Sequence, residues 1–169
     1  MTVQKIYFDM DGVLADFDRG VAELCHLKIP PINVFRSIAE DNLMWRAIGT
    51  ISHFYGRLEL MPGAKEMFDT IYGKYGDRCE ILTGIPRPKR GILHAGEDKE
   101  KWVRRMLSDQ IHVNIVYREE KLLRCTGPDC ILIDDLELTI AAWQKRGGTG
   151  ILHTGAEDTI RQMQAMGLL

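Results

Sequence analysis

The sequence predicts an α/β fold, in which a parallel five-stranded sheet carries helices on both faces and a small helical segment is inserted after the first strand. Short apolar runs alternate with stretches whose apolar residues recur at helical spacing, which is typical of a parallel sheet. Strands are expected at 4–9, 78–83, 111–116, 130–134 and 149–153. An acidic pair lies at the carboxyl end of two of these runs. Open parallel sheets bind their ligands at the carboxyl ends of their strands.

The first half of the chain is predicted to be mostly helical after its opening strand. A helix is expected to start near Asp16 and to end before Pro30-Pro31, because a residue before proline is disfavoured in a helix. Residues 32–60 have helical spacing without a strand pattern. Pro62-Gly63 then opens a helix, which Gly73 or Gly76 ends.

In the second half, strands and helices alternate. Residues 84–97 contain two prolines and three glycines and are expected to form a loop. Helices are predicted at 97–107, 136–146 and 156–166. Gly147-Gly148 turns the chain before the last strand.

The distance between the first two strands suggests an inserted unit. The second strand begins about seventy residues after the first, whereas a crossover between parallel strands needs only a dozen or so. We therefore expect a core made of residues 1–15 and 63–169, with a small helical cap at 16–62.

The first acidic pair follows the apolar run Lys5–Phe8. Side chains alternate along a strand, so Asp9 and Asp11 can face the same crevice, and Gly12 lets the chain turn away. Two such carboxylates repel unless a cation neutralises them, and oxygen ligands without His or Cys suit Mg²⁺. One carboxylate can then attack phosphorus while the other protonates the leaving oxygen. The alternative is an acidic turn that only caps the next helix.

Further polar residues at strand ends argue against a simple capping turn. Thr83-Gly84 ends the second strand with a hydroxyl and a backbone N–H that can bind phosphate, and Asp134-Asp135 ends the fourth. Three lysines between these motifs could neutralise the acids and a phosphate: Lys99, Lys101 and Lys121.

Together these motifs resemble the haloacid dehalogenase (HAD) superfamily of phosphohydrolases. The stretch Asp9–Phe17 is most similar to the 5′(3′)-deoxyribonucleotidase branch, and Leu82–Gly84 and Ile133–Asp135 resemble later motifs of the superfamily. Lys99–Val103 and Arg118–Lys121 are similar to that branch's Lys-x-x-Trp-Val and Arg-x-Lys segments. The resemblance covers nearly the whole chain and implies a HAD-like, Rossmannoid core whose cap closes over a phosphate pocket.

The resemblance implies a magnesium-dependent phosphomonoesterase that works through an aspartyl-phosphate. Asp9 would be the nucleophile and Asp11 the general acid and base. The Mg²⁺ site would comprise Asp9, Asp11 through its backbone carbonyl, and Asp134, while Asp135 supports or shares that role.

It also implies the phosphate and substrate contacts. Thr83, Gly84, Lys121 and Lys99 are expected to bind phosphate or balance its charge, whereas Lys101, two residues from Lys99 on a helix, faces solvent. The substrate pocket is expected to contain two aromatic residues that stack on a base, Phe17 and Trp45. For Trp45, the alternative is that it forms the small core of the cap itself together with Phe54.

Composition limits the partners. With 22 basic and 24 acidic residues, the net charge is −2, so no extended nucleic-acid surface is expected. No apolar run approaches the length of about 18 residues that a membrane span needs, so no membrane partner is expected. The four cysteines lack zinc-type spacing, and without a secretory signal we expect a cytoplasmic monomer or homodimer.

The expected partner is a small-molecule phosphomonoester, most naturally a nucleoside monophosphate. Caps vary and a fold does not fix a substrate, so another small phosphomonoester or a nucleic-acid 3′-phosphate end is the alternative. A non-catalytic nucleotide-binding module is a further alternative, although such a module has no need of Asp11 as a proton donor.

Overall fold

The computed structural model describes residues 2–169, and its centre is a five-stranded parallel sheet in the order β3-β2-β1-β4-β5. All five predicted strands are confirmed to within one residue at each end. Their bounds are β1 (Lys5–Phe8), β2 (Cys79–Gly84), β3 (His112–Val116), β4 (Cys130–Asp134) and β5 (Thr149–Leu152). Because β1 lies between β2 and β4, the carboxyl ends of these three strands meet at the middle of one sheet edge.

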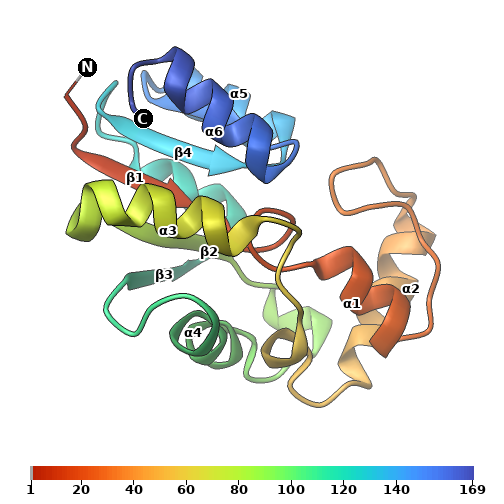
Figure 1. Cartoon of the computed structure of the whole chain (residues 1–169). Helices are drawn as coiled ribbons and strands as arrows, with labels where there is room; N and C mark the ends of the chain where they lie inside the picture. Colours follow the sequence, from red (N-terminus) through yellow and green to blue (C-terminus); the bar gives the residue numbers. More distant parts are fainter. Residues whose placement is uncertain (1) are drawn as a thin grey trace.

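Helices cover both faces of the sheet, as predicted (Figure 1). The larger core cluster joins Ile6 and Phe8 of β1 to residues of α3 (Ala64–Tyr75), α4 (Ala95–Met106) and α6 (Ala156–Ala165). On the other face, Tyr7 packs edge-on against Trp143 of α5 (Glu137–Lys145), with ring centroids 5.8 Å apart. The alternation of β1 side chains therefore separates the two cores.

The start of one helix differs from expectation after β2, and one of the two predicted ends of α3 is confirmed. The helix α4 begins at Ala95, two residues before the predicted start, and the expected loop contains a short 3₁₀ turn, η3 (Pro88–Arg90). Gly76 follows α3 with a φ of 55° and ends it, so the alternative end at Gly73 is wrong. Outside the inserted segment, the other 3₁₀ segments are η2 (Gly76–Arg78) and η4 (Arg118–Arg124).

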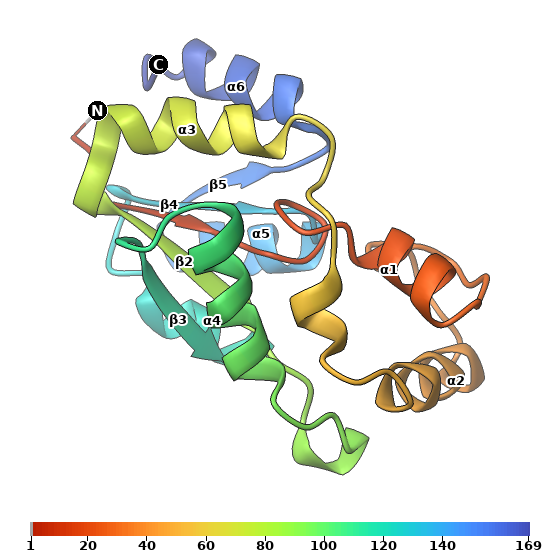
Figure 2. The same ribbon diagram turned by 60° about the horizontal axis from the view of Figure 1, so that its bottom comes forward.

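The inserted segment contains α1 (Phe17–Leu24), α2 (Ile38–Gly49) and η1 (Phe54–Arg57). Figures 1 and 2 show α1 and α2 to one side of the sheet, beyond the carboxyl ends of its strands. The Asp16 carboxylate caps α1 by accepting a hydrogen bond from the Arg19 N–H at 3.1 Å. This helix ends at Leu24, before Pro30 as predicted, and His26, with a φ of 51°, lies in the irregular stretch that follows.

Two chain segments connect the inserted helices to the core, and they run side by side. Ala15 forms a bridge with Leu60, the Asp16 N–H donates to the Glu59 carbonyl at 2.8 Å, and the Met61 N–H donates to Leu14 at 2.8 Å. The indole N–H of Trp102 on α4 fixes the second segment by donating to the Leu58 carbonyl at 2.7 Å. Within residues 2–169, no helix has the length and apolar character needed to cross a membrane.

Candidate active site

Three carboxylates gather at the edge where β1 and β4 end. Asp9 follows β1 directly, and its N–H donates to Ile133 of β4 at 2.9 Å, which fixes it beside Asp134 and Asp135. One carboxylate oxygen from each of Asp9, Asp134 and Asp135 lies within 4.8 Å of the others, and all three residues are buried. We call these residues the acid triad.

Lys121 of η4 lies against the acid triad. Its Nζ is 2.7 Å from Asp9 Oδ1 and 2.8 Å from Asp134 Oδ2. Burial alone would lower the pKa of Lys121, but the carboxylates of Asp9 and Asp134 outweigh burial and raise it. The structure thus brings Lys121 to the predicted nucleophile, in its charged form.

Asp11 faces a second buried lysine. Lys99 Nζ on α4 is 2.6 Å from Asp11 Oδ2, and Lys99 also donates to Thr83 Oγ1 at 2.9 Å and to the Gly84 carbonyl at 2.7 Å. Burial raises the pKa of Asp11, Lys99 opposes that rise, and Asp9 adds to it. Within residues 2–169, Asp11 Oδ1 is a buried oxygen without a hydrogen-bond partner.

The predicted phosphate contacts separate into two layers. Gly84 and Lys121 line a pocket above the acids, whereas Thr83 and Lys99 are fully buried and do not line it. Lys99 therefore contacts Asp11 rather than the pocket itself. Lys101 is exposed and pairs with Glu97, as the helical spacing predicts.

The charges of the site fit a hard divalent cation. Asp11 and the acid triad supply four carboxyl groups, whereas Lys99 and Lys121 supply two positive charges. Burial, followed by the charges of Asp9 and Asp134, raises the pKa of Asp135 to about 8. The donors are all oxygen atoms, which Mg²⁺ prefers. The Asp11 side chain lies outside the acid triad, in keeping with a ligand role for its backbone carbonyl.

A cavity of about 670 Å³ extends from Asp9 and Asp11 to α2 and the loop after β2, a size typical of small-molecule sites. Both predicted aromatic residues line it. Phe17 is only 1% exposed, because its ring packs against Trp45, Phe54 and Tyr55 at centroid distances of 6.4, 5.7 and 6.3 Å. Trp45 is half-buried and therefore presents more of its surface to the cavity.

Sequence reasoning missed the basic lining of this cavity. Five cationic side chains line it in addition to Lys121: Arg36, Arg87, Lys89, Arg90 and Arg118. From its sequence, the run Arg87–Arg90 is either a solvated loop or a segment that meets a phosphate; Arg87 and Lys89 are exposed, and both also line the cavity. Its position directly after β2 was the available signal, because the carboxyl ends of the strands carry the site.

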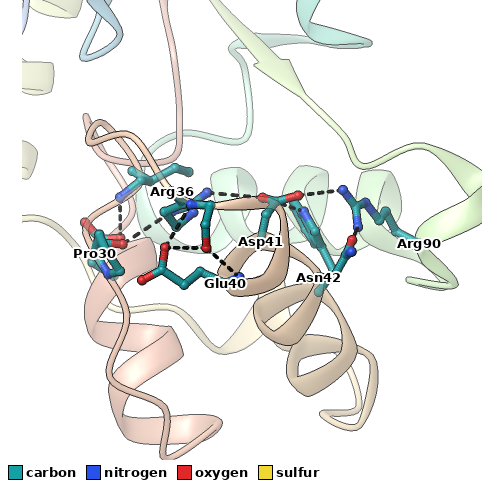
Figure 3. A network of polar contacts seen from close by, with 10 residues as sticks. Pro30, Arg36, Glu40, Asp41, Asn42 and Arg90 are labelled. Carbon is teal, nitrogen blue, oxygen red and sulfur yellow. Dashed lines mark hydrogen bonds and ion pairs between the residues drawn. The ribbon is translucent and has the colours of Figure 1, made fainter.

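One carboxylate organises the part of this lining that joins α2 to η3 (Figure 3). Asp41 accepts from Arg90 at 2.5 Å and from the indole N–H of Trp45 at 3.2 Å, and its Oδ1 lies 3.7 Å from Arg36. Arg90 also donates to Asn42 at 2.6 Å. Asp41 therefore fixes two guanidinium groups and one indole on the cavity wall.

The same fold occurs in solved hydrolase structures. A HAD-superfamily hydrolase of subfamily IA from Geobacter sulfurreducens superposes with a TM-score of 0.54 and 13% identity, covering 95% of this chain and 100% of that one. Hydrolases from Pseudomonas syringae (TM-score 0.51, 13% identity, 93% and 89% covered) and Streptococcus pneumoniae TIGR4 (0.50, 14%, 99% and 100%) are also similar. The chain therefore has the fold of HAD-superfamily hydrolases.

Sequence comparisons add no closer assignment, since no family model and no curated protein matches the chain. At 13–14% identity, the structural likeness shows the fold alone. The similarity to the 5′(3′)-deoxyribonucleotidase branch stays a prediction.

Proposed function

We propose that the protein is a magnesium-dependent phosphomonoesterase of the HAD type that hydrolyses nucleoside monophosphates through an aspartyl-phosphate on Asp9. The observation that carries this proposal is the acid triad with Lys121 on Asp9 Oδ1 at 2.7 Å. Lys121 is a buried cation that orients the Asp9 oxygen it contacts. The other Asp9 oxygen is left free to attack phosphorus.

The proposed reaction has two steps, and both use Asp9 and Asp11. In the first, an Asp9 oxygen forms a bond to phosphorus as the bond to the leaving oxygen breaks, and Asp11 gives that oxygen a proton. In the second, Asp11 takes a proton from water, whose oxygen attacks phosphorus, and Asp9 is released with inorganic phosphate. Lys99, 2.6 Å from Asp11, stabilises its carboxylate between the steps.

Asp9, Asp134, Asp135 and the Asp11 carbonyl would hold Mg²⁺, which when bound offsets the negative charge of the phosphate and the acids. Lys121 holds Asp9 in place, and the Gly84 backbone, which lines the cavity, is positioned to contact phosphate oxygens.

The nucleotide preference rests on the resemblance and on the shape of the cavity. Its volume accommodates a nucleoside, and Trp45 offers an aromatic surface on which a base can stack. A different small phosphomonoester is the second candidate, favoured by the basic lining, which could recognise groups other than a base.

The test is phosphate release from a chromogenic phosphomonoester with and without Mg²⁺, comparing the unchanged protein with Asp9→Asn. We expect turnover that needs Mg²⁺, stops with chelator and falls by several orders of magnitude in Asp9→Asn. Turnover by Asp9→Asn, or full activity in excess chelator, would overturn the proposal. A panel of nucleoside and sugar monophosphates then tests the substrate class, and equal rates across it would contradict the nucleotide assignment.

A further inference from the structure

Positive charge is concentrated where the segments after β2 and β3 and the segment before α2 line the cavity. Five cations line it there, and among residues 2–169 the acids that line it besides Asp9, Asp11 and Asp135 are Asp41 and Glu137. The chain as a whole carries a net charge of −2, so this excess is local. We call the five cations the basic rim: Arg36, Arg87, Lys89, Arg90 and Arg118.

Part of the basic rim has no counter-charge. Arg87 pairs with Glu119 and lies over the Tyr117 ring at 3.8 Å, which occupies its guanidinium. Lys89 and Arg118 form no ion pair or side-chain hydrogen bond with any residue from 2 to 169. Both side chains line the cavity and are exposed, so they are available to a ligand.

The rest of the basic rim is held in place by neighbouring acids. Arg36 and Arg90 share one carboxylate, Asp41, and the charge of Arg36 also acts on the carboxyl groups of Asp18 and Glu40. The Arg36 side chain is only 10% exposed, and Arg90 also binds Asn42. A planar guanidinium fixed by such bonds loses little freedom when it binds phosphate or carboxylate.

We propose that the basic rim is a second anion subsite, and that the substrate is a phosphomonoester with a second anionic group on the part of the molecule away from the reacting phosphate. This inference rests on the proposed function, because one phosphate must occupy the acid triad. The second group is a phosphate or a carboxylate, since both accept the paired N–H donors of arginine. Among such substrates, a nucleoside 3′,5′-bisphosphate also has a base that can stack on Trp45.

The experiment measures kcat/KM for matched substrate pairs in the presence of Mg²⁺. One pair is adenosine 3′,5′-bisphosphate against adenosine 5′-monophosphate, and the other is a phosphorylated hydroxy acid against the phosphorylated alcohol of the same length. A preference of about tenfold or more for the doubly charged member of either pair supports the subsite, and the pair concerned identifies the second group. No preference in either pair overturns it.

The variant test uses the two unpaired cations. Lys89→Ala with Arg118→Ala should lower the preference ratio by about tenfold or more, whereas Lys145→Ala, an exposed lysine on α5 outside the cavity, should leave the ratio unchanged. If Lys145→Ala lowers the preference ratio equally, the preference for the doubly charged substrate comes from the overall charge of the protein, which contradicts a local subsite.

Two further arms separate the possible failures. A single-stranded oligonucleotide with a terminal phosphate is the competing substrate, and a preference for it over both small-molecule pairs would overturn the small-molecule subsite. A chromogenic phosphomonoester without a second charge reports the chemistry alone. If that substrate is not hydrolysed, the proposed function fails, and if it is hydrolysed without any charge preference, only the second subsite fails.

Discussion

At the scale of single residues, the acid triad depends on the turn at Gly12. This glycine has a φ of +82°, and a Cβ placed on it would lie 2.3 Å from Asp135 Oδ2. Gly12→Ala should therefore displace Asp135, abolish most phosphate release and lower the melting temperature. Gly73→Ala is the matched control, because Gly73 lies within α3 with open space around it, and alanine there should stabilise the helix by about 0.5–1 kcal/mol. Wild-type activity in Gly12→Ala would contradict this assignment.

A second residue-scale prediction concerns Phe17, which is 1% exposed within a cluster of aromatic rings. Phe17→Ala should lower the free energy of unfolding by about 3–5 kcal/mol, as removal of a buried aromatic ring does. Trp45→Phe should retain the fold but lose the hydrogen bond to Asp41, so its effect should fall on kcat/KM for a nucleotide. Denaturant unfolding and substrate kinetics measure the two effects. An unchanged unfolding free energy in Phe17→Ala would show that the ring is not a structural element.

The sequence predicts that residues at the ends of neighbouring strands lie close together, because the sheet topology alone brings those ends to one edge. Asp9 and the pair Asp134-Asp135 meet for this reason. It does not predict that Lys99 contacts Asp11, or that Thr83 is covered, because these depend on the packing of α4. The shared carboxylate of Asp41 was likewise missed, since it joins Arg36 and Arg90 from segments far apart in the chain.

At the scale of the elements, a polar chain ties three neighbouring strands together. Glu80 of β2 bonds Lys5 of β1 at 2.5 Å and Asn114 of β3 at 2.8 Å. Burial alone would raise the pKa of Glu80, but its bonds to Lys5 and Asn114 prevail and lower it. Because the folded state favours the ionised form, this stabilisation is present above the ordinary carboxyl pKa and is lost as pH falls through the lowered value.

Glu80→Gln should therefore lower the free energy of unfolding at pH 7 by about 1 kcal/mol. The difference from the unchanged protein should shrink below about pH 4, where the carboxyl group is protonated. Denaturant unfolding at several pH values measures it. Glu23→Gln, which removes an exposed ion pair with Arg19, is the control and should change little. A difference for Glu80→Gln that does not vary with pH would exclude the ionised carboxylate as its source.

The elements themselves show where sequence patterns suffice. Short apolar runs define all five strands, because a buried parallel strand has few polar positions. The pattern predicts that α1 ends before Pro30, but not that the chain turns back after Leu24, where the Ile32 N–H donates to the Asp18 carboxylate at 2.9 Å. That contact spans fourteen residues and has no signature in local spacing.

At the scale of the whole molecule, four buried or partly buried carboxyl groups against two lysines should make the fold sensitive to Mg²⁺. A ligand at 100 times its dissociation constant stabilises the folded state by about 2.7 kcal/mol, which for a chain of this size corresponds to a melting temperature roughly 5–10 °C higher. Thermal unfolding with Mg²⁺ or with chelator measures this. Asp135→Asn should reduce the shift, whereas Asp69→Asn, on the exposed face of α3, should preserve it. No shift in the unchanged protein would contradict the metal site.

The most direct test of the account is to find the phosphate on the protein during turnover. The unchanged protein is mixed with a phosphomonoester and Mg²⁺, quenched rapidly in acid and digested, and the peptides are examined by mass spectrometry. We expect a phosphoryl group on Asp9 that disappears as substrate is exhausted and is missing from Asp9→Asn. Phosphate release without any labelling of Asp9, or with the label on another residue, would contradict an aspartyl-phosphate on Asp9.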